Sequence, residues 1–167
     1  MPAAQDLGEL LPVVDEYDRP LGQGPRWLIH RDGLRHRAVH VLLLDGRGRL
    51  YLQRRSMQKD THPGKWTSSA SGHVDPGEGY EAAAARELAE ELGLLAPLLP
   101  LGRLAAQPST EMEFSAVYLA QSDQTPAPNP SEISEGRFFG QDEALALAGD
   151  PDQAVPSLGL VLELLWG

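Results

Sequence analysis

One stretch, residues 72–94 (GHVDPGEGYEAAAARELAEELGL), constrains the fold of this chain more than any other. Within it, Glu87, Glu90 and Glu91 follow the spacing i, i+3, i+4, which in a helix places three side chains on one face. A second, apolar face is formed by Ala85, Leu88 and Leu92. The pattern predicts a helix that packs one face on a core and presents carboxylates on the other.

The clustered acids indicate that this face of the helix binds a ligand, because acids at this spacing do not stabilise a helix. Like charges at i, i+4, as at Glu87 and Glu91, destabilise a helix by about 0.2–0.5 kcal/mol. Grouped carboxylate oxygens suit Mg²⁺, a hard cation that is usually shared with substrate phosphates. The preceding loop, residues 72–79, is rich in glycine, which lets backbone amides approach a ligand closely. Gly93 stands where a helix C-cap glycine belongs, so loop and helix together predict a metal and phosphate site.

The same stretch resembles the Nudix box at every defined position. The matching residues are Gly72, Glu78, Arg86-Glu87-Leu88, Glu90-Glu91 and Gly93-Leu94. Segments around the box resemble the isopentenyl-diphosphate isomerase-like branch of Nudix proteins, namely residues 34–38, 53–55, 62–66, 72–74 and 111–113. The resemblance implies the Nudix fold, an α/β architecture with a mixed β-sheet sandwiched between helices, formed by a single domain over residues 1–167.

The resemblance also implies an activity, the attack of water on a phosphorus atom of a nucleoside-linked diphosphate. The implied metal ligands are Glu87, Glu90, Glu91, Gly72 and Glu111, and the implied ion is Mg²⁺, with Mn²⁺ as the alternative. The general base is a box glutamate or Glu111 or Glu113, and variation within the family leaves that choice open. Arg86 is expected to orient the glutamates, although a surface pair with Glu90 at i, i+4 explains it equally well.

Residues before the box are candidates for substrate binding. Arg55 and Lys59 match positions where the isomerases hold a diphosphate, and Lys65 adds a third cation nearby. Trp66 is placed either to stack on a nucleobase or to anchor its loop in the core. The cationic set favours a compact polyphosphate, and we expect free nucleoside di- and triphosphates as substrates rather than nucleotide sugars.

Two departures from the isomerases favour a hydrolase on an isomerase-like frame. Ser71 stands where the isomerases use a cysteine to move a proton at carbon, and a hydroxyl is far too weak an acid for that step. This chain also retains every acid of the box, whereas the isomerases depart from the full hydrolase box. The second metal site of the isomerases is nonetheless matched by His36, His73, Glu111 and Glu113, although histidines are as often structural.

Two alternatives to the hydrolase remain at this point. An isopentenyl-diphosphate isomerase is disfavoured by Ser71 and is separable by an assay with isopentenyl diphosphate. A non-catalytic nucleotide sensor is disfavoured because every acid of the box is present. The expected function is therefore Mg²⁺-dependent hydrolysis of nucleoside di- and triphosphates or related nucleoside diphosphate derivatives.

Composition narrows the classes of partner. The net charge is −10, with +3 in residues 1–66 (eleven Lys and Arg, eight Asp and Glu) and −13 in residues 67–167, so the basic footprint of a nucleic-acid-binding protein is missing. The chain has no Cys, which excludes disulfides and thiol nucleophiles. No leader-like or membrane-spanning pattern is present. We expect a cytoplasmic monomer or homodimer with no nucleic-acid or membrane partner.

Local patterns predict the remaining elements. The predicted strands are a hairpin over 13–22 with its turn near Asp18, a second hairpin from 38–45 and 49–54, and strands 67–74, 98–106, 112–121 and 133–139. The predicted helices besides that of the box are 141–148 and 157–166. Residues 1–12 are expected to be a loose terminus and residues 26–37 a polar connection.

Overall fold

The computed structural model describes residues 8–167. Its elements in chain order are β1 (Leu10–Val14), β2 (Pro20–Pro25), α1 (Arg26–Asp32), β3 (His36–Leu44), β4 (Leu50–Arg55), β5 (Trp66–Thr67), β6 (Ala70–His73), α2 (Tyr80–Leu92), β7 (Leu99–Leu104), the 3₁₀ turn η2 (Pro108–Thr110), β8 (Glu113–Gln121), β9 (Ile133–Phe139), α3 (Gln141–Ala148) and α4 (Leu158–Trp166). In these residues no helix has the length and apolar character needed to cross a membrane.

Most strands of the described chain belong to one mixed sheet in the order β5-β4-β3-β8-β7, with β6 paired to β3 and β9 paired to β4. The β3–β8 pair is parallel, and the other pairs of this sheet are antiparallel. The parallel register aligns His36 with Glu113, which brings two candidate site residues together at the strand starts. A separate two-stranded sheet forms from β1 and β2.

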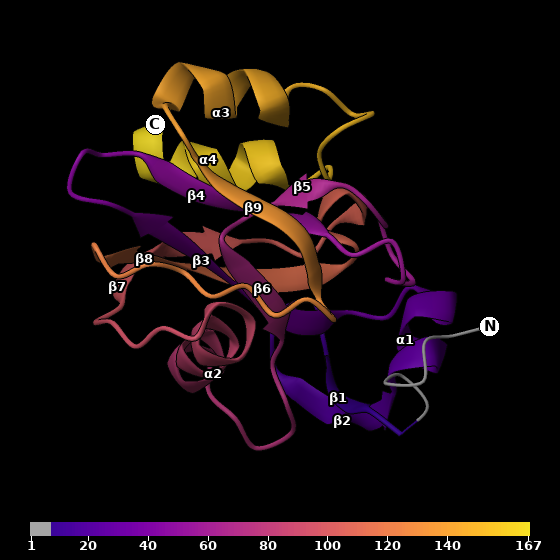
Figure 1. Ribbon diagram of the computed structural model, residues 1–167. Helices are drawn as coiled ribbons and strands as arrows, with labels where there is room; N and C mark the ends of the chain where they lie inside the picture. Colours follow the sequence, from indigo (N-terminus) through magenta and orange to yellow (C-terminus); the bar gives the residue numbers. More distant parts are fainter. Residues whose placement is uncertain (1–7) are drawn as a thin grey trace.

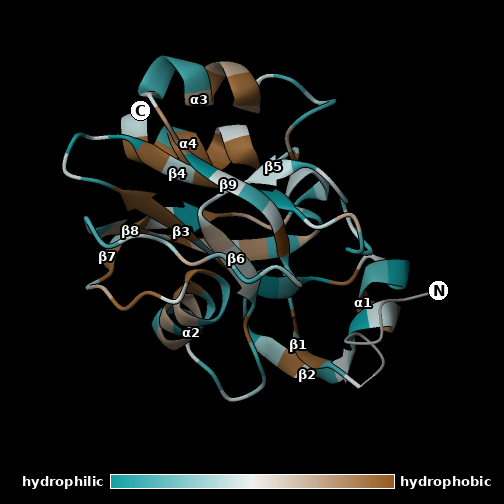
Figure 2. Cartoon of the chain, viewed as in Figure 1, coloured by the Kyte–Doolittle hydropathy of each residue, from teal (hydrophilic) through white to brown (hydrophobic). Residues whose placement is uncertain are grey.

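Helices cover both faces of the mixed sheet, as Figure 1 shows with α2 on one side and α3 and α4 on the other. Because side chains alternate across a strand, β3 sends Val39, Val41 and Leu43 into the core beneath α2 and sends Leu42 into the core beneath α3 and α4. Figure 2 shows apolar colour on strands of the mixed sheet and on α4, which packs against it. The expected α/β/α sandwich with a mixed sheet is confirmed.

The helix of residues 72–94 is α2, and its burial corrects part of the predicted pattern. Leu88 and Leu92 face the core as expected, together with Ala83 and Ala84. Ala85 is exposed instead, so the apolar face is turned by one position relative to the prediction. Gly93 ends the helix in the left-handed conformation with φ of 67°, as its C-cap position requires.

The remaining elements match the sequence pattern with three corrections. Residues 133–139 and 141–148 form the strand and helix predicted. The expected polar connection over 26–37 is wrong, because it contains α1 and the start of β3. The predicted strand over 67–74 is divided, and only its second part, β6, pairs with β3. The loose terminus expected over 1–12 lies partly outside the described residues, and its last residues belong to β1.

Candidate active site

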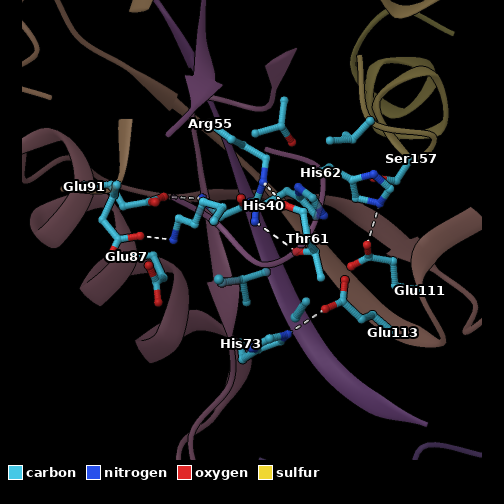
Figure 3. A pocket seen from close by; sticks show the side chains of 18 of the residues that line it. His40, Arg55, Thr61, His62, His73, Glu87, Glu91, Glu111, Glu113 and Ser157 are labelled. Carbon is cyan, nitrogen blue, oxygen red and sulfur yellow. Dashed lines mark hydrogen bonds and ion pairs between the residues drawn. The ribbon is translucent and has the colours of Figure 1, made fainter. Parts of the chain in front are cut away.

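A cavity of about 600 Å³ is lined by residues of α2, β3, β6 and the loops that follow β4 and precede β8. Figure 3 shows the acids of α2 on one side, Glu111 and Glu113 on the other, and Arg55 and His40 between them. We call Glu87, Glu90 and Glu91 the acid wall, and Arg26, Arg55 and Lys59 the cationic wall. Both walls face the same cavity, so the fold brings together charges that lie far apart in the sequence.

Glu91 is the most enclosed residue of the acid wall, with only 5% of its surface exposed. One of its carboxylate oxygens accepts hydrogen bonds from the Ser71 amide at 2.7 Å and from Gln53 Nε2 at 3.2 Å. Burial raises the pKa of Glu91 to about 7, although the Ser71 amide and Lys59 oppose the rise. The expectation that the acids simply point outward is therefore wrong for this residue.

Glu87 lies beside Glu91 against the backbone of Gly72. Burial, and next to it the repulsion from Glu91, raise the pKa of Glu87 to about 8, against the opposing effect of Arg86. A Cβ at Gly72 would lie 2.2 Å from Glu87 Oε1, so only glycine leaves room for this carboxylate. Glu90 lies at the rim, with 59% of its side chain exposed. The structure thus places the Glu87 carboxylate against Gly72, holds Glu91 at the neighbouring Ser71 amide and leaves Glu90 at the entrance.

Arg86 ties the glycine-rich loop to the acid wall. Its Nε and one terminal nitrogen each donate to Glu78 at 2.9 Å, a bidentate arrangement, and it also donates to the His73 carbonyl at 3.0 Å. The other terminal nitrogen donates to Glu87 at 2.8 Å and lies 3.4 Å from Glu90. Because the Glu90 contact is the longest of these, a simple i, i+4 surface pair does not account for Arg86. Its geometry fits a residue that orients Glu87.

A second group of metal-ligating side chains, the histidine group, lies at the start of β3 and β8. Its members, His30, His36, His73 and Glu113, each offer one ligand atom within 4.8 Å of the others. A carboxylate oxygen of Glu113 lies 2.9 Å from His73 Nε2 and 3.2 Å from His36 Nε2. Burial opposes the charge of Glu113, but its two histidine partners outweigh burial and hold its pKa well below the usual range.

Burial, and then repulsion from the other histidines, lower the pKa of His30 to about 4, so this ring is neutral at physiological pH. Its Nε2 atom is buried without a hydrogen-bond partner among the described residues, as a metal ligand's lone pair would be. His30 was missed in the sequence because its helix was not predicted. The i, i+3, i+4 spacing of Arg26, Ile29 and His30 is the signal that identifies one face of α1.

Glu111 lies outside the histidine group. Its carboxylate oxygen is 2.5 Å from Nε2 of His62, a residue of the loop after β4, and both side chains line the cavity. Both residues have left-handed backbone, with φ of 57° and 45°, which is uncommon outside glycine. Glu111 therefore lies apart from the other expected metal ligands and pairs with His62 at the wall of the cavity.

Of the expected substrate-binding residues, two line the cavity and two do not. Arg55 donates to the carbonyl and hydroxyl oxygens of Thr61, and Lys59 forms an ion pair with Glu132. Lys65 is directed to the carbonyl of Pro151 at 2.5 Å, away from the cavity. Trp66 is buried in the core with its ring edge-on to Phe139, which corrects the stacking role and agrees with the anchoring role.

The floor of the cavity includes a histidine that the sequence analysis missed. His40 is buried in β3, and its Nδ1 atom lies 2.7 Å from Ser68 Oγ. Burial lowers the pKa of His40. Because His36 and His40 stand four positions apart on a strand, the strand period places both on one face, and that is the signal in the sequence.

Comparisons with known proteins agree on the family. The model of the NUDIX domain matches residues 34–158. The chain is 42% identical over 160 residues to an isopentenyl-diphosphate Delta-isomerase of Nocardia farcinica, covering 91% of each chain. It is also 42% identical over 144 residues to an uncharacterized Nudix hydrolase of Pseudomonas aeruginosa, covering 86% of this chain and 85% of the relative.

A solved structure extends this agreement. The crystal structure of DR0079 from Deinococcus radiodurans has a TM-score of 0.80 and 33% sequence identity to this chain. The match covers 93% of this chain and 99% of that one. Relatives of comparable identity carry names for two different reactions, so the reaction has to be argued from the cavity.

Proposed function

Because the chain belongs to the Nudix family, of the isopentenyl-diphosphate isomerase-like branch, we propose that it is a Mg²⁺-dependent pyrophosphohydrolase of nucleoside di- and triphosphates. The observation that carries the proposal is the acid wall facing the cationic wall across one cavity. Carboxylates of this kind hold a divalent cation, and the opposite cations hold the phosphates that share it.

The acid wall fits a divalent cation on its own chemistry. Glu87 and Glu91 are buried side by side; burial raises the pKa of both, and repulsion from Glu91 adds to the rise at Glu87. Gly72 leaves open the space that a side chain would fill, next to the Glu87 carboxylate. A bound cation would remove the repulsion, so we assign Glu87, Glu91 and Glu90, with the backbone at Gly72, as the residues that hold Mg²⁺.

When bound, Mg²⁺ neutralises phosphate charge and makes the attacking water a better nucleophile. Arg86 holds Glu87 in position, and Arg55 presents a guanidinium to the non-bridging phosphate oxygens. Glu113 is a poor general base because its histidine partners hold its pKa well below the usual range. Glu111 is already paired with His62. We therefore assign the general base to a glutamate of the acid wall.

The lining of the cavity favours a polar substrate over an isoprenoid. The apolar side chains among its lining residues are Ala38, Val39, Val155 and Pro156. Hydroxyl, amide and imidazole groups provide much of the rest, namely His40, His62, His73, Thr61, Thr67, Thr110, Ser71, Ser109, Ser157 and Asn129. A nucleoside offers hydrogen-bonding partners for such groups, whereas a branched five-carbon chain would leave them unpaired.

An isopentenyl-diphosphate isomerase is the second candidate. Relatives of that name and the histidine group favour it, since the group coincides with the second metal site implied by the resemblance. The four donors, three imidazoles and one carboxylate, suit a transition metal such as Mn²⁺. Ser71 argues against the isomerase reaction, because its hydroxyl is not acid enough to move a proton at carbon.

One experiment separates the two candidates. Purified protein is incubated with Mg²⁺ and a panel of nucleoside diphosphates, triphosphates and nucleotide sugars, and phosphate release is measured beside conversion of isopentenyl diphosphate. We expect release from free nucleotides and none of the isomerase product. Glu91→Gln protein serves as the background. Isomerase turnover without nucleotide hydrolysis would replace the proposal, and a nucleotide sugar that is tenfold better would correct only the substrate.

A further inference from the structure

The cations of the cationic wall differ in how they are engaged. Arg26 pairs with Asp60 at 2.9 Å and with Glu9 at 3.6 Å. Lys59 pairs with Glu132. Arg55 binds only neutral oxygens of Thr61, and no carboxylate of residues 8–167 forms an ion pair with it. Arg55 is thus the cation whose charge is open to an incoming anion.

Glu132 is held in place by its backbone on both sides. Its amide donates to the Asn129 carbonyl at 3.0 Å, and its carbonyl accepts from the Ser56 amide at 3.0 Å. Asn129 is fixed in turn, because its amide donates to the Glu91 carbonyl at the end of α2. The carboxylate of Glu132 is therefore held next to Lys59 by a segment whose backbone is hydrogen-bonded at two places. One hydrogen bond joins it to α2, which carries the acid wall, and the other joins it to the loop after β4.

The Lys59–Glu132 pair lies inside the cavity rather than on the outer surface. Both residues line it, and their side chains are 13% and 26% exposed. Burial, and then the charge of Arg55, lower the pKa of Lys59, while Glu91 and Glu87 of the acid wall oppose the decrease. Glu132 is the carboxylate that forms a direct ion pair with the Lys59 ammonium.

We propose that Glu132 is an internal counter-ion that occupies Lys59 until a diphosphate displaces it, so that Glu132 sets the affinity of the site for polyphosphates. The inference rests on the proposed function, in which Arg55 and Lys59 bind phosphate. Arg55 anchors the first phosphoryl group, and the second competes with Glu132 for the Lys59 ammonium. Glu132 is then a positioning residue that acts through Lys59.

The test uses Glu132→Gln, which preserves shape and removes the charge. Affinity is measured calorimetrically with Mg²⁺ and methylenediphosphonate, whose P–C–P bridge cannot be hydrolysed, so binding is read without turnover. We expect the dissociation constant to fall about three- to tenfold, because the competing charge is gone. KM for nucleoside diphosphates should fall by a similar factor while kcat stays within about twofold.

Two further variants test the route through Lys59. In a Lys59→Met background, the same Glu132→Gln change should leave the affinity unaltered, since there is no ammonium to release. Glu135→Gln is the matched control, because Glu135 is half-exposed, lies on β9 and faces Arg54 at 3.9 Å outside the cavity. It should leave affinity and turnover unchanged.

A merely structural pair would give a different pattern. Glu132→Gln would then lower the melting temperature with no gain in affinity, and that result overturns the inference. Weaker binding in Glu132→Gln, or no binding of methylenediphosphonate to the unaltered protein, overturns it as well. If the protein hydrolyses no nucleotide yet Glu132→Gln tightens methylenediphosphonate, the proposed function fails and the counter-ion role stands.

Discussion

The acid wall and the histidine group are both candidate metal sites, and they balance charge in opposite ways. In the acid wall, Glu87 and Glu91 have raised pKa values because they are buried together with too little positive charge. In the histidine group, Glu113 has a depressed pKa because its interactions with His36 and His73, hydrogen bonds first, outweigh the effect of its burial. The acid wall therefore destabilises the folded protein when its carboxylates are ionised and no cation is bound. In the histidine group, the imidazoles already compensate part of the cost of burying the Glu113 carboxylate.

This comparison predicts its largest effect on turnover. Glu91→Gln or Glu90→Gln should lower kcat at least about 100-fold, roughly 2.7 kcal/mol of activation free energy, because a ligand charge is lost from an isosteric side chain. The measurement is steady-state nucleotide hydrolysis with saturating Mg²⁺. Glu81→Gln, an exposed acid in the first turn of α2, is the control and should be silent. Near-normal turnover in both site variants would end the assignment of the acid wall.

The next effect is on the pH dependence of stability without metal. Glu87 and Glu91 have folded pKa values of about 8 and about 7, above the ordinary value of 4.5, so the folded state holds more protons between these limits. The free energy of unfolding should therefore fall by several kcal/mol as pH rises from about 4.5 to 8, because each unit of raised pKa corresponds to about 1.4 kcal/mol. Urea titrations in EDTA measure it, and Glu87→Gln should reduce the slope. An equal slope in that variant would contradict the raised pKa.

Removing an acid from each group should change stability in opposite directions. Glu113→Gln leaves His36 and His73 without their buried carboxylate and should lower the free energy of unfolding by about 2 kcal/mol in EDTA at neutral pH. Glu91→Gln removes repulsion and should leave stability equal or higher. Paired denaturant titrations measure both. Two losses of similar size would show that the groups do not differ as described.

Mg²⁺ should stabilise the protein through the acid wall. At ten times the dissociation constant, binding to the folded state alone adds about 1.4 kcal/mol, which raises the melting temperature. Thermal melts from zero to tens of millimolar Mg²⁺ measure the effect, and Glu91→Gln should reduce it. A melting temperature that does not respond to Mg²⁺, together with no heat of binding, would count against cation binding here.

The acid wall could be predicted from the sequence because its three acids are close neighbours along the chain and belong to one helix. The spacing of Glu87, Glu90 and Glu91 needs only the helix period, and Gly93 marks the helix end. Burial of Glu91 was not predictable, because it depends on Gln53 and Ser71 from separate strands. A helical pattern states which residues share a face but not how deeply the neighbouring strands enclose it.

The histidine group and the cationic wall depend on contacts between distant residues. His30 and Glu113 meet because α1 packs at the start of β3 and β3 runs parallel to β8, a pairing that no local pattern reveals. Glu132 reaches Lys59 from a proline-rich loop that has no periodicity of its own. For Trp66 the local pattern allowed two positions, because an aromatic residue after a turn fits a core position and a ligand contact equally well. Its contact with Phe139 decides for the core position.

The smallest predicted effect concerns Ser71, which contributes to the acid wall through its backbone alone. Its amide donates to Glu91, and within residues 8–167 its hydroxyl forms no hydrogen bond. Ser71→Ala keeps the amide, so nucleotide hydrolysis should remain within about threefold, or roughly 0.7 kcal/mol. Ser71→Cys, assayed beside it with isopentenyl diphosphate, tests whether restoring a thiol favours the isomerase reaction on this frame. A large loss of hydrolysis in folded Ser71→Ala protein would show that the hydroxyl itself acts on the substrate. It would contradict the statement that Ser71 contributes through its backbone alone.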